Sequence, residues 1–244
     1  MRNATVLQKT DAVILCGGRG KRLGAVTKDM PKPMVMIGKK PFLEILIEYV
    51  SSFGFRRFVL CVGHKKEAVE DYFRNRKDGV TIVYSEELDG KLLGTGGAIK
   101  NAEGLIESEA FLVMNGDSFA PIDLGKFFGL HEQRGKDVSM VLTKASGRND
   151  AGSVRLNETD EVIGFSEKES VDRETYMNAG VYFFNKTVFR NIAPGVHSSL
   201  EYDLFPALVN SGIYGYVTDA DVIDIGTPER LEKAKTFFMG GLKR

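Results

Sequence analysis

The stretch DAVILCGGRGKRLG, residues 11–24, decides the fold class. Residues 12–16 form an unbroken apolar run, which is typical of a strand buried in a parallel sheet. A loop with four glycines and three cations follows, and backbone N–H groups in such a loop can approach phosphate oxygens because no Cβ stands in the way. The stretch predicts a strand that ends in a phosphate-binding loop, although a glycine-rich turn with solvated charges has the same composition.

Two familiar phosphate motifs are excluded at this loop. A Walker loop requires Ser or Thr after its Gly-Lys pair, but Arg22 follows Lys21. A dinucleotide fingerprint requires Gly at the position that Leu23 occupies. An NAD-binding module is therefore a disfavoured alternative.

The charge of the chain is balanced overall and basic near this loop. The 244 residues include 33 basic and 33 acidic residues, whereas residues 17–40 contain seven basic residues and one acidic residue. An even balance argues against a broad nucleic-acid surface, and the local excess suits a small polyanion. We expect a small phosphorylated ligand and no nucleic acid.

Outward from the opening stretch, apolar runs alternate with helical patterns, as a parallel sheet with crossover helices requires. After residue 145 the pattern changes to short alternating runs, which predict antiparallel strands inserted over one end of the sheet. The predicted strands are residues 11–16, 57–62, 80–84, 110–115, 138–143, 151–156, 162–166 and 180–184, and the predicted helices are residues 42–53, 65–76, 123–134 and 228–238. The fold class is therefore α/β, a Rossmann-like three-layer sandwich with a mostly parallel mixed central sheet and a small inserted antiparallel part.

Composition excludes several other classes. No apolar run exceeds five residues, against the roughly 20 that a bilayer requires, and the start has no apolar signal core, so we expect a cytoplasmic chain. Cys16 and Cys61 lie in apolar runs and are expected to be buried thiols in a reducing compartment. His64, His131 and His197 are far apart in sequence, so zinc and triad chemistry are disfavoured.

A lysine and two aspartates are the candidate reactive residues. Lys32 lies between two prolines, which restrict the backbone on both sides and hold the cation on a stiff segment. Asp117 follows a predicted buried strand, and Asp224 follows another apolar run 107 residues later. Open α/β sheets bind ligands at the carboxyl ends of their strands, and carboxylates with phosphate oxygens and water suit Mg²⁺. Taken singly, each aspartate also fits a turn or cap.

These segments resemble the sugar-nucleotidyltransferases, the NDP-sugar pyrophosphorylases. Members carry a glycine-rich opening loop that ends in Arg-Leu, a Pro-Lys-Pro with a catalytic lysine, a Gly-Asp with one metal aspartate, and a second metal aspartate before a late glycine. The matching residues here are Arg22-Leu23, Pro31-Lys32-Pro33, Gly116-Asp117 and Asp224-Ile225-Gly226. The resemblance covers residues 11 to about 235 and implies the nucleotide-diphospho-sugar transferase fold.

The resemblance implies a role for each matching residue. Arg22 and Lys32 would be catalytic, and Asp117 and Asp224 would hold Mg²⁺. The sugar 1-phosphate would contact Gly152, Glu167, Lys168 and Asn178. The nucleoside triphosphate would contact Leu15, Gly17, Gly18, Arg19, Gly20, Lys21, Glu86, Glu87, Gly94 and Thr95.

Within the family, residues 93–99 and the compact length are most similar to the heptose 1-phosphate guanylyltransferases. The implied reaction joins GTP and D-glycero-α-D-manno-heptose 1-phosphate into GDP-heptose for bacterial surface glycans. Guanine offers N1–H and N2–H₂ as donors, so the carboxylate of Glu86 or Glu87 could accept both. The alternatives are a mannose 1-phosphate guanylyltransferase, a glucose 1-phosphate thymidylyl-, cytidylyl- or uridylyltransferase, and a non-catalytic nucleotide sensor.

The resemblance also implies one domain over residues 1–244. Residues 11–144 would bind the nucleotide, residues 145–220 the sugar phosphate, and residues 221–244 would supply the second metal aspartate and a closing helix. Phe237, Phe238 and Met239 fit either the core or the surface of a homodimer. No membrane partner is expected.

Overall fold

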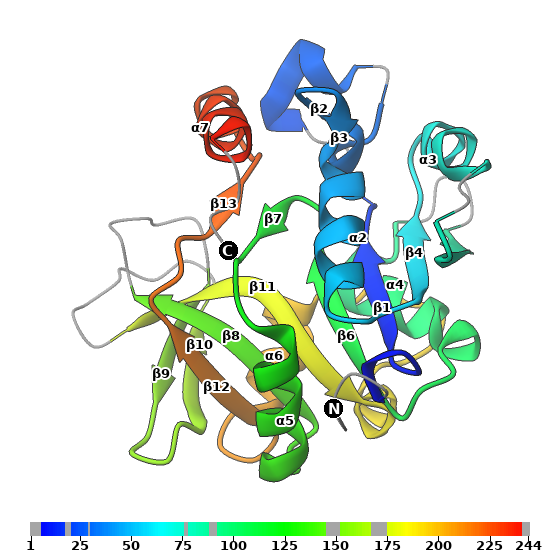
Figure 1. Ribbon diagram of the computed structural model, residues 1–244. Coiled ribbons are helices and arrows are strands. Elements are labelled where there is room, and N and C mark those ends of the chain that lie inside the picture. The colour runs from blue at the N-terminus through cyan, green and yellow to red at the C-terminus, as the bar shows by residue number, and fades with distance from the viewer. Residues whose placement is uncertain are drawn as a thin grey trace.

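The computed structural model describes residues 6–17, 21–28, 30–75, 78–87, 92–144, 152–166 and 175–240 (Figure 1). Within these ranges, nine strands form one mixed sheet, in which seven strands follow the order β10-β9-β11-β6-β1-β4-β5, while β8 pairs with β11 and β12. The strands are β1 (Asp11–Leu15), β4 (Arg57–Val62), β5 (Thr81–Glu86), β6 (Ala110–Asn115), β8 (Val138–Lys144), β9 (Ser153–Leu156), β10 (Val162–Ser166), β11 (Tyr176–Asn185) and β12 (Ile213–Thr218).

The first part of the sheet is parallel, as the alternating pattern predicted. β1 lies between β4 and β6 and is parallel to both, and β5 is parallel to β4. All five residues of β1 are buried, which explains the apolar run that follows Asp11. Because these strands are parallel, their carboxyl ends lie at one edge of the sheet, where the opening loop begins.

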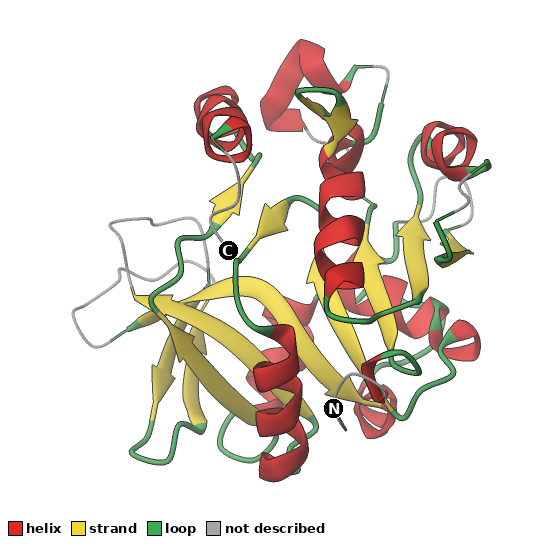
Figure 2. Cartoon of the chain, in the orientation of Figure 1, coloured by secondary structure: helices red, strands yellow, loops and turns green. Residues whose placement is uncertain are grey.

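The antiparallel strands predicted after residue 145 are present, and they pair into the same mixed sheet. The connection is β11, which the sequence predicted only over residues 180–184. The strand has ten residues and pairs antiparallel with β6, β8 and β9. Figure 2 shows it as a long curved strand across the middle of the molecule. The parallel half and the antiparallel half of the chain therefore share one strand.

Helices cover both faces of the sheet and complete the predicted three layers. One buried apolar cluster joins a sheet face to α2 (Phe42–Ser52), α5 (Leu124–Arg134) and α7 (Pro228–Met239). A second cluster joins the other face to α4 (Gly94–Asn101), the short π-helix η5 (Leu200–Leu204) and α6 (Phe205–Leu208). α3 (Lys66–Phe73) packs at the edge near β4 and β5 (Figure 1).

Local sequence signals set the ends of two helices. The Asp123 carboxylate accepts a hydrogen bond from the Lys126 backbone N–H at 2.9 Å at the start of α5, and Gly135 ends it with φ of +61°. α7 begins with Thr227 as its N-cap and Pro228 as its first residue, as predicted. These two helices follow from their sequences alone.

Short elements complete the chain beside the sheet. Two small two-stranded sheets pair β2 (Met36–Ile37) with β3 (Lys40–Pro41), and β7 (Ser118–Phe119) with β13 (Ile223–Asp224). The 3₁₀ segments are η1 (Lys21–Thr27), η2 (Lys32–Met34), η3 (Glu103–Leu105) and η4 (Lys186–Asn191). Among the helices that the structure describes, none is both long and apolar enough to cross a bilayer.

The cysteines and one histidine are core residues. Cys16 and Cys61 are buried free thiols, and burial raises the pKa of Cys61 to about 12. Both thiols therefore stay protonated and unreactive. His131 is 1% exposed between the Ser139 hydroxyl and the Asn185 side chain, and burial lowers its pKa. Its neutral ring is a structural link between α5 and the sheet.

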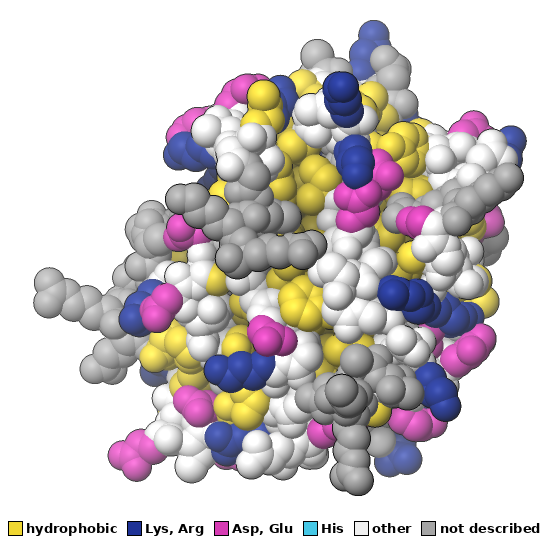
Figure 3. Space-filling view, in the orientation of Figure 1, with side chains coloured by type: hydrophobic (Ala, Val, Ile, Leu, Met, Phe, Trp, Pro, Cys, Tyr) yellow, Lys and Arg dark blue, Asp and Glu magenta, His cyan; other side chains and the backbone are white. Residues whose placement is uncertain are grey.

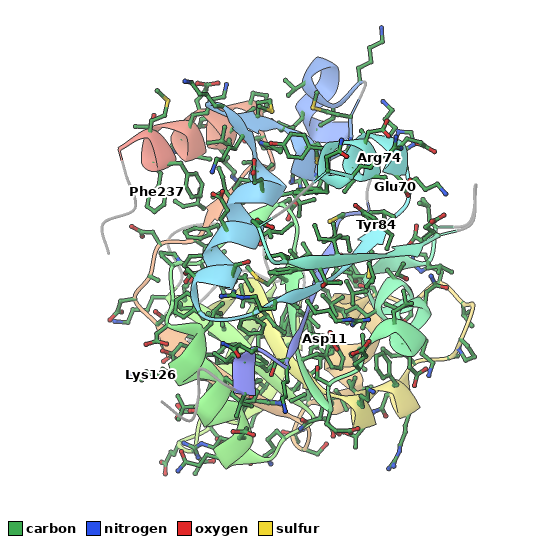
Figure 4. All side chains as sticks on the ribbon, turned by 45° about the vertical axis from the view of Figure 1, so that its right-hand side comes forward. Asp11, Glu70, Arg74, Tyr84, Lys126 and Phe237 are labelled. Atoms are coloured by element: carbon green, nitrogen blue, oxygen red, sulfur yellow. The ribbon has the colours of Figure 1, made fainter. Side chains whose placement is uncertain are left out.

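Asp11 holds the start of β1 to the segment that leads into β6 (Figure 4). It is 1% exposed, and its Oδ1 accepts a hydrogen bond from Arg57 Nη1 at 2.7 Å. Its Oδ2 accepts the backbone N–H groups of Glu107 and Ser108 at 2.6 and 2.9 Å. A buried carboxylate with this many donors is costly to alter, because each donor would lose its partner away from water.

We expect Asp11→Asn to lower the free energy of unfolding by roughly 3 kcal/mol, since the neutral amide cannot satisfy the guanidinium and both N–H groups. Urea denaturation followed by circular dichroism measures this change. The matched control is Glu107→Gln, because Glu107 pairs with the same Arg57 but its side chain is 74% exposed. That variant should lose less than about 1 kcal/mol, and equal losses in the two variants would contradict the assignment.

Candidate active site

One cavity of about 420 Å³ lies at the carboxyl ends of β6 and β8 and beside β13. Arg22, Lys32, Asp117 and Asp224 all line it, although they come from η1, η2, the β6–β7 turn and β13. Sequence reasoning required these four residues to share one pocket. The structure brings them together.

Lys32 enters the cavity from the stiff Pro-Lys-Pro segment. Pro31 precedes η2 with extended backbone, and Pro33 is buried behind it. Lys32 Nζ donates to Asp117 Oδ2 at 2.5 Å, and 12% of the lysine side chain is exposed against 40% of the aspartate side chain. In the free protein, the charges of Lys32 and Asp117 therefore lie in direct contact on the wall of the cavity.

Gly116 allows this approach. Its N–H donates to the Leu15 carbonyl at 2.9 Å, and a Cβ at this position would lie 2.6 Å from that oxygen and 3.1 Å from Pro33 Cγ. No real side chain fits those distances. The glycine of the Gly-Asp pair is therefore needed for the end of β1, the Pro-Lys-Pro segment and Asp117 to meet.

Asp224 reaches the site through the pairing of β7 with β13. Asp224 lies opposite Ser118 in this small sheet, and the Ile225 N–H donates to the Asp117 carbonyl at 3.1 Å. Asp224 Oδ1 accepts the Gly226 N–H at 2.8 Å and Arg230 Nη1 at 3.4 Å. Backbone hydrogen bonds thus hold the two aspartates of distant segments side by side.

The two carboxylates fit a magnesium ion by their chemistry. Mg²⁺ takes oxygen ligands and is commonly held by one or two carboxylates, with substrate phosphates and water completing the shell. In the part of the chain that the structure describes, no cluster of three or more His, Cys, Asp or Glu side chains suits a metal. Asp117 and Asp224 alone would supply two of the oxygen ligands of such an ion.

Gly152 and Asn178 lie on another wall of the same cavity. The Asn178 N–H donates to the Gly152 carbonyl at 3.0 Å, and Asn178 Nδ2 donates to the buried Tyr182 hydroxyl at 2.7 Å. The Gly180 N–H donates to Asn178 Oδ1 at 3.0 Å, so both ends of the amide are fixed. At the rim, the exposed Lys144 and Asp219 form an ion pair at 2.8 Å.

The described residues assigned to the nucleotide lie in two places, at the end of β1 and between the end of β5 and the start of α4. Leu15 ends β1, and Gly17, two residues later, is exposed. Glu86 ends β5 and is paired with Lys66, whereas Glu87 is half-buried and accepts the Leu93 N–H at 3.4 Å. Burial raises the pKa of Glu87, and the nearby His197 opposes that rise. Glu87 is thus the carboxylate that faces the start of α4.

The hydroxyl of Thr95 makes two hydrogen bonds within the protein. Thr95 starts α4 with Gly94, and its hydroxyl donates to Glu201 Oε2 at 2.9 Å and accepts the Leu200 N–H at 2.8 Å. These two bonds use the hydroxyl for internal contacts. Gly18, Arg19, Gly20, Glu167 and Lys168 lie outside the described residues, as does the side chain of Lys21.

Asn115, Glu201 and Arg230 are among the cavity-lining residues that sequence reasoning did not assign. Asn115 precedes the Gly-Asp pair, and its buried Oδ1 has no hydrogen-bond partner within the described chain. Arg230 follows the predicted N-cap of α7 by three residues, so its position in the first turn of that helix could be predicted from the sequence. Nothing near Glu201 marked it, because only the folded chain brings η5 to this wall.

The electrostatic character of the surface agrees with a local rather than an extended anion site. On the face shown in Figure 3, basic and acidic side chains are interspersed and do not separate by sign. Arg22, which is exposed, and Lys32, which is partly buried, line the cavity together with the two aspartates. Such a site suits a compact phosphorylated ligand.

Comparisons with known proteins agree with this architecture. The nucleotidyl transferase family model matches residues 11–239. A D-glycero-alpha-D-manno-heptose 1-phosphate guanylyltransferase from Aneurinibacillus thermoaerophilus is 38% identical over 92% of this chain and 96% of its own length. The enzyme of the same name from Campylobacter jejuni is also 38% identical, over 89% of this chain and 95% of its own.

A solved structure gives the same result in three dimensions. The crystal structure of HddC from Yersinia pseudotuberculosis complexed with GMP-PN has a TM-score of 0.81 and 33% identity, and the match covers 94% of this chain and 99% of that one. The predicted resemblance and α/β fold class are confirmed. The chain belongs to the nucleotidyl transferase family.

Proposed function

We propose that the protein transfers a guanylyl group from GTP to a sugar 1-phosphate, with D-glycero-α-D-manno-heptose 1-phosphate as the sugar substrate and GDP-heptose for bacterial surface glycans as the product. The observation that carries this proposal is the shared cavity of Arg22, Lys32, Asp117 and Asp224. Two relatives named for this reaction match about nine-tenths of the chain, which supports the choice of base and sugar.

The reaction is an in-line substitution at phosphorus. A phosphate oxygen of the sugar 1-phosphate forms a bond to the α-phosphorus of GTP, and the bond from that phosphorus to the β-bridging oxygen breaks. Pyrophosphate leaves with the electron pair of that bond. A phosphate monoester has a second pKa near ~6 and is already mostly dianionic at neutral pH, so no side chain has to remove a proton.

The residues of the cavity then have to hold two anions close together. Lys32 and Arg22 supply positive charge on fixed segments, and charge that is fixed in place stabilises a transition state without reorganisation. Asp117 and Asp224 would hold Mg²⁺, which would neutralise charge on the phosphate oxygens. Glu167 and Lys168 would contact the sugar and its phosphate by the family resemblance.

The Lys32–Asp117 ion pair has to open for this role. In the free protein each group neutralises the other at 2.5 Å. A phosphate would take Lys32, and Asp117 would turn to the magnesium ion. The ion pair therefore keeps both charged side chains at the cavity until the triphosphate replaces Asp117 as the partner of Lys32.

Glu87 is the better candidate for reading guanine. Glu86 is already paired with Lys66, whereas Glu87 faces Leu93 and the start of α4. A carboxylate at this position could accept both N1–H and N2–H₂ of guanine, a pair of donors that a pyrimidine lacks. On this proposal, selectivity for GTP depends on Glu87 and not on the adjacent Glu86.

Pyrophosphate release with GTP, CTP, UTP, dTTP and ATP, each crossed with heptose, mannose and glucose 1-phosphates, tests the function and the role of Glu87. Turnover should be fastest with GTP and the heptose, and Glu87→Gln should raise the KM for GTP by about tenfold because one donor loses its acceptor. Glu86→Gln is the matched control and should leave that KM within about twofold. A preference for dTTP or CTP would overturn the guanine assignment.

The raised pKa of Glu87 adds a pH test to the same experiment. A carboxyl with a raised pKa takes up its proton at a higher pH than an ordinary glutamate and then stops accepting from guanine. GTP affinity should therefore fall on acidification earlier than an unperturbed glutamate would allow, and Glu87→Gln should lack this step.

We expect Lys32→Ala and Asp117→Asn each to lower kcat by roughly a hundredfold or more, because each removes a charge at the reaction centre. Steady-state kinetics at saturating Mg²⁺ measures the change, and thermal unfolding checks that the fold is retained. Lys39→Ala is the matched control, because Lys39 is exposed and belongs to the same basic region. A rise in KM alone would show that Lys32 binds the ground state and the transition state equally.

A further inference from the structure

Glu201 lies on the wall of the active-site cavity and has no role in the reaction described above. It is the second residue of η5, at the opposite end of the sequence from the phosphate-binding loop. We propose that the Glu201 carboxylate accepts a hydrogen bond from a hydroxyl group of the sugar 1-phosphate, and that Thr95 positions this carboxylate. The inference rests on the proposed function and concerns which sugars the cavity accepts.

The carboxylate of Glu201 is held through one of its oxygens. Oε2 accepts hydrogen bonds from the Thr95 hydroxyl at 2.9 Å and from the Ser199 hydroxyl at 2.8 Å. No residue in the described part of the chain donates to Oε1. One oxygen is therefore anchored, and the other remains an acceptor on a cavity wall.

The backbone around Glu201 is fixed as well. Ser199 caps η5, and its oxygen accepts the N–H groups of Glu201 and Tyr202 at 3.1 and 3.2 Å. The Ser199 N–H donates to the Asp203 carboxylate at 2.7 Å. A short helix with a complete cap leaves the Glu201 side chain little freedom, and little entropy is lost when it binds a ligand.

Thr95 connects this segment to α4. Its hydroxyl accepts the Leu200 N–H at 2.8 Å while it donates to Glu201, and the Gly96 and Gly97 N–H groups both donate to the Ser198 carbonyl. A Cβ at Gly94 would lie 2.5 Å from the same carbonyl. α4 and the segment before η5 therefore pack backbone to backbone, and Thr95 acts on the ligand only through Glu201.

Position and charge favour a hydroxyl group as the partner of Glu201. The cavity also contains Gly152 and Asn178, which belong to the wall assigned to the sugar. The ring of Phe205, which follows η5, packs on the ring of Tyr182 with 5.1 Å between their centroids, and the Tyr182 hydroxyl accepts from Asn178. This aromatic contact joins the segment that carries Glu201 to the strand that carries Asn178. A carboxylate repels the phosphates that Lys32 and Arg22 attract and forms strong hydrogen bonds with neutral O–H donors.

Glu201→Gln tests the acceptor without removing the anchor. The glutamine carbonyl can take the hydroxyls of Thr95 and Ser199, and its NH₂ then presents donors where the free carboxylate oxygen was an acceptor. The KM for the sugar 1-phosphate that turns over best should rise at least about tenfold, while the KM for the triphosphate stays within about twofold. Glu132→Gln is the matched control, because it makes the same change at an exposed acid that does not line the cavity, and it should change neither constant.

Thr95 is tested by removing and restoring its hydroxyl. Thr95→Val should raise the KM for the sugar 1-phosphate, and Thr95→Ser, which keeps the hydroxyl, should restore it. Monodeoxy analogues of that sugar 1-phosphate identify the hydroxyl involved. The wild-type protein should reject one analogue most strongly, and Glu201→Gln should lose most of that preference because the site no longer offers the acceptor.

The outcomes separate this inference from the proposed function. Wild-type turnover together with an unchanged sugar KM in Glu201→Gln would overturn the inference and leave the function in place. Absence of turnover with every pair of substrates would overturn the proposed function. In that case calorimetric titration of heptose, mannose and glucose 1-phosphates decides for Glu201, since equal or absent binding in wild type and Glu201→Gln would overturn its role.

Discussion

The contact between the end of β1 and the β6–β7 turn determines where Lys32 and Asp117 meet. At Gly116 the chain passes so close to the Leu15 carbonyl and the Pro33 ring that no side chain would fit. The turn then delivers Asp117 to the cavity, and the same contact holds the Pro-Lys-Pro segment so that Lys32 meets Asp117. The close contact of the backbone at Gly116 thus brings together two opposite charges, Lys32 and Asp117, that are more than eighty residues apart in the sequence.

The second requirement is that opposite charges coexist in a cavity before any substrate enters. Lys32 is paired with Asp117, and Asp224 is paired with Arg230 and the Gly226 N–H. Burying any of these charges alone would be costly, whereas pairs compensate each other. The free protein therefore keeps its reactive groups stable by letting them neutralise one another, and phosphates with a metal ion would replace those internal partners.

The parts of the fold with strong periodic signals followed from the sequence. Helix α2 was predicted because its apolar residues recur on one face, and α7 because Thr227 and Pro228 mark its start. Helix α4 was not predicted, because residues 94–97 include three glycines, which have low intrinsic helix propensity. Those glycines are needed because Ser198 packs directly against the helix, and this contact arises only in the folded chain. β12 was missed as well, since a tyrosine-rich strand broken by Gly215 resembles a loop.

The residues of the candidate site that belong to sequence motifs could be predicted. The residues that reach the site only through the tertiary structure could not. Lys32, Asp117 and Asp224 were identified from stiffness and from strand ends, and the structure brings them into one cavity. Glu201 had no local signal, and the hydroxyl of Thr95 turned out to serve an internal bond. Side chains that meet only after folding carry no pattern that a single sequence can show.

The shared strand β11 has a consequence for how the protein accommodates its ligands. Asn178, on the sugar wall, and Val181, which pairs with β6, are separated by two residues of one continuous strand. Gly180, with φ of +73°, lies between these two residues at a shift in the register of β11 against β8, so the strand bends there while one backbone joins the two walls of the cavity. On the proposed function, sugars of different size would then be accommodated by side chains at the rim, and the distance between the two phosphates would be unchanged.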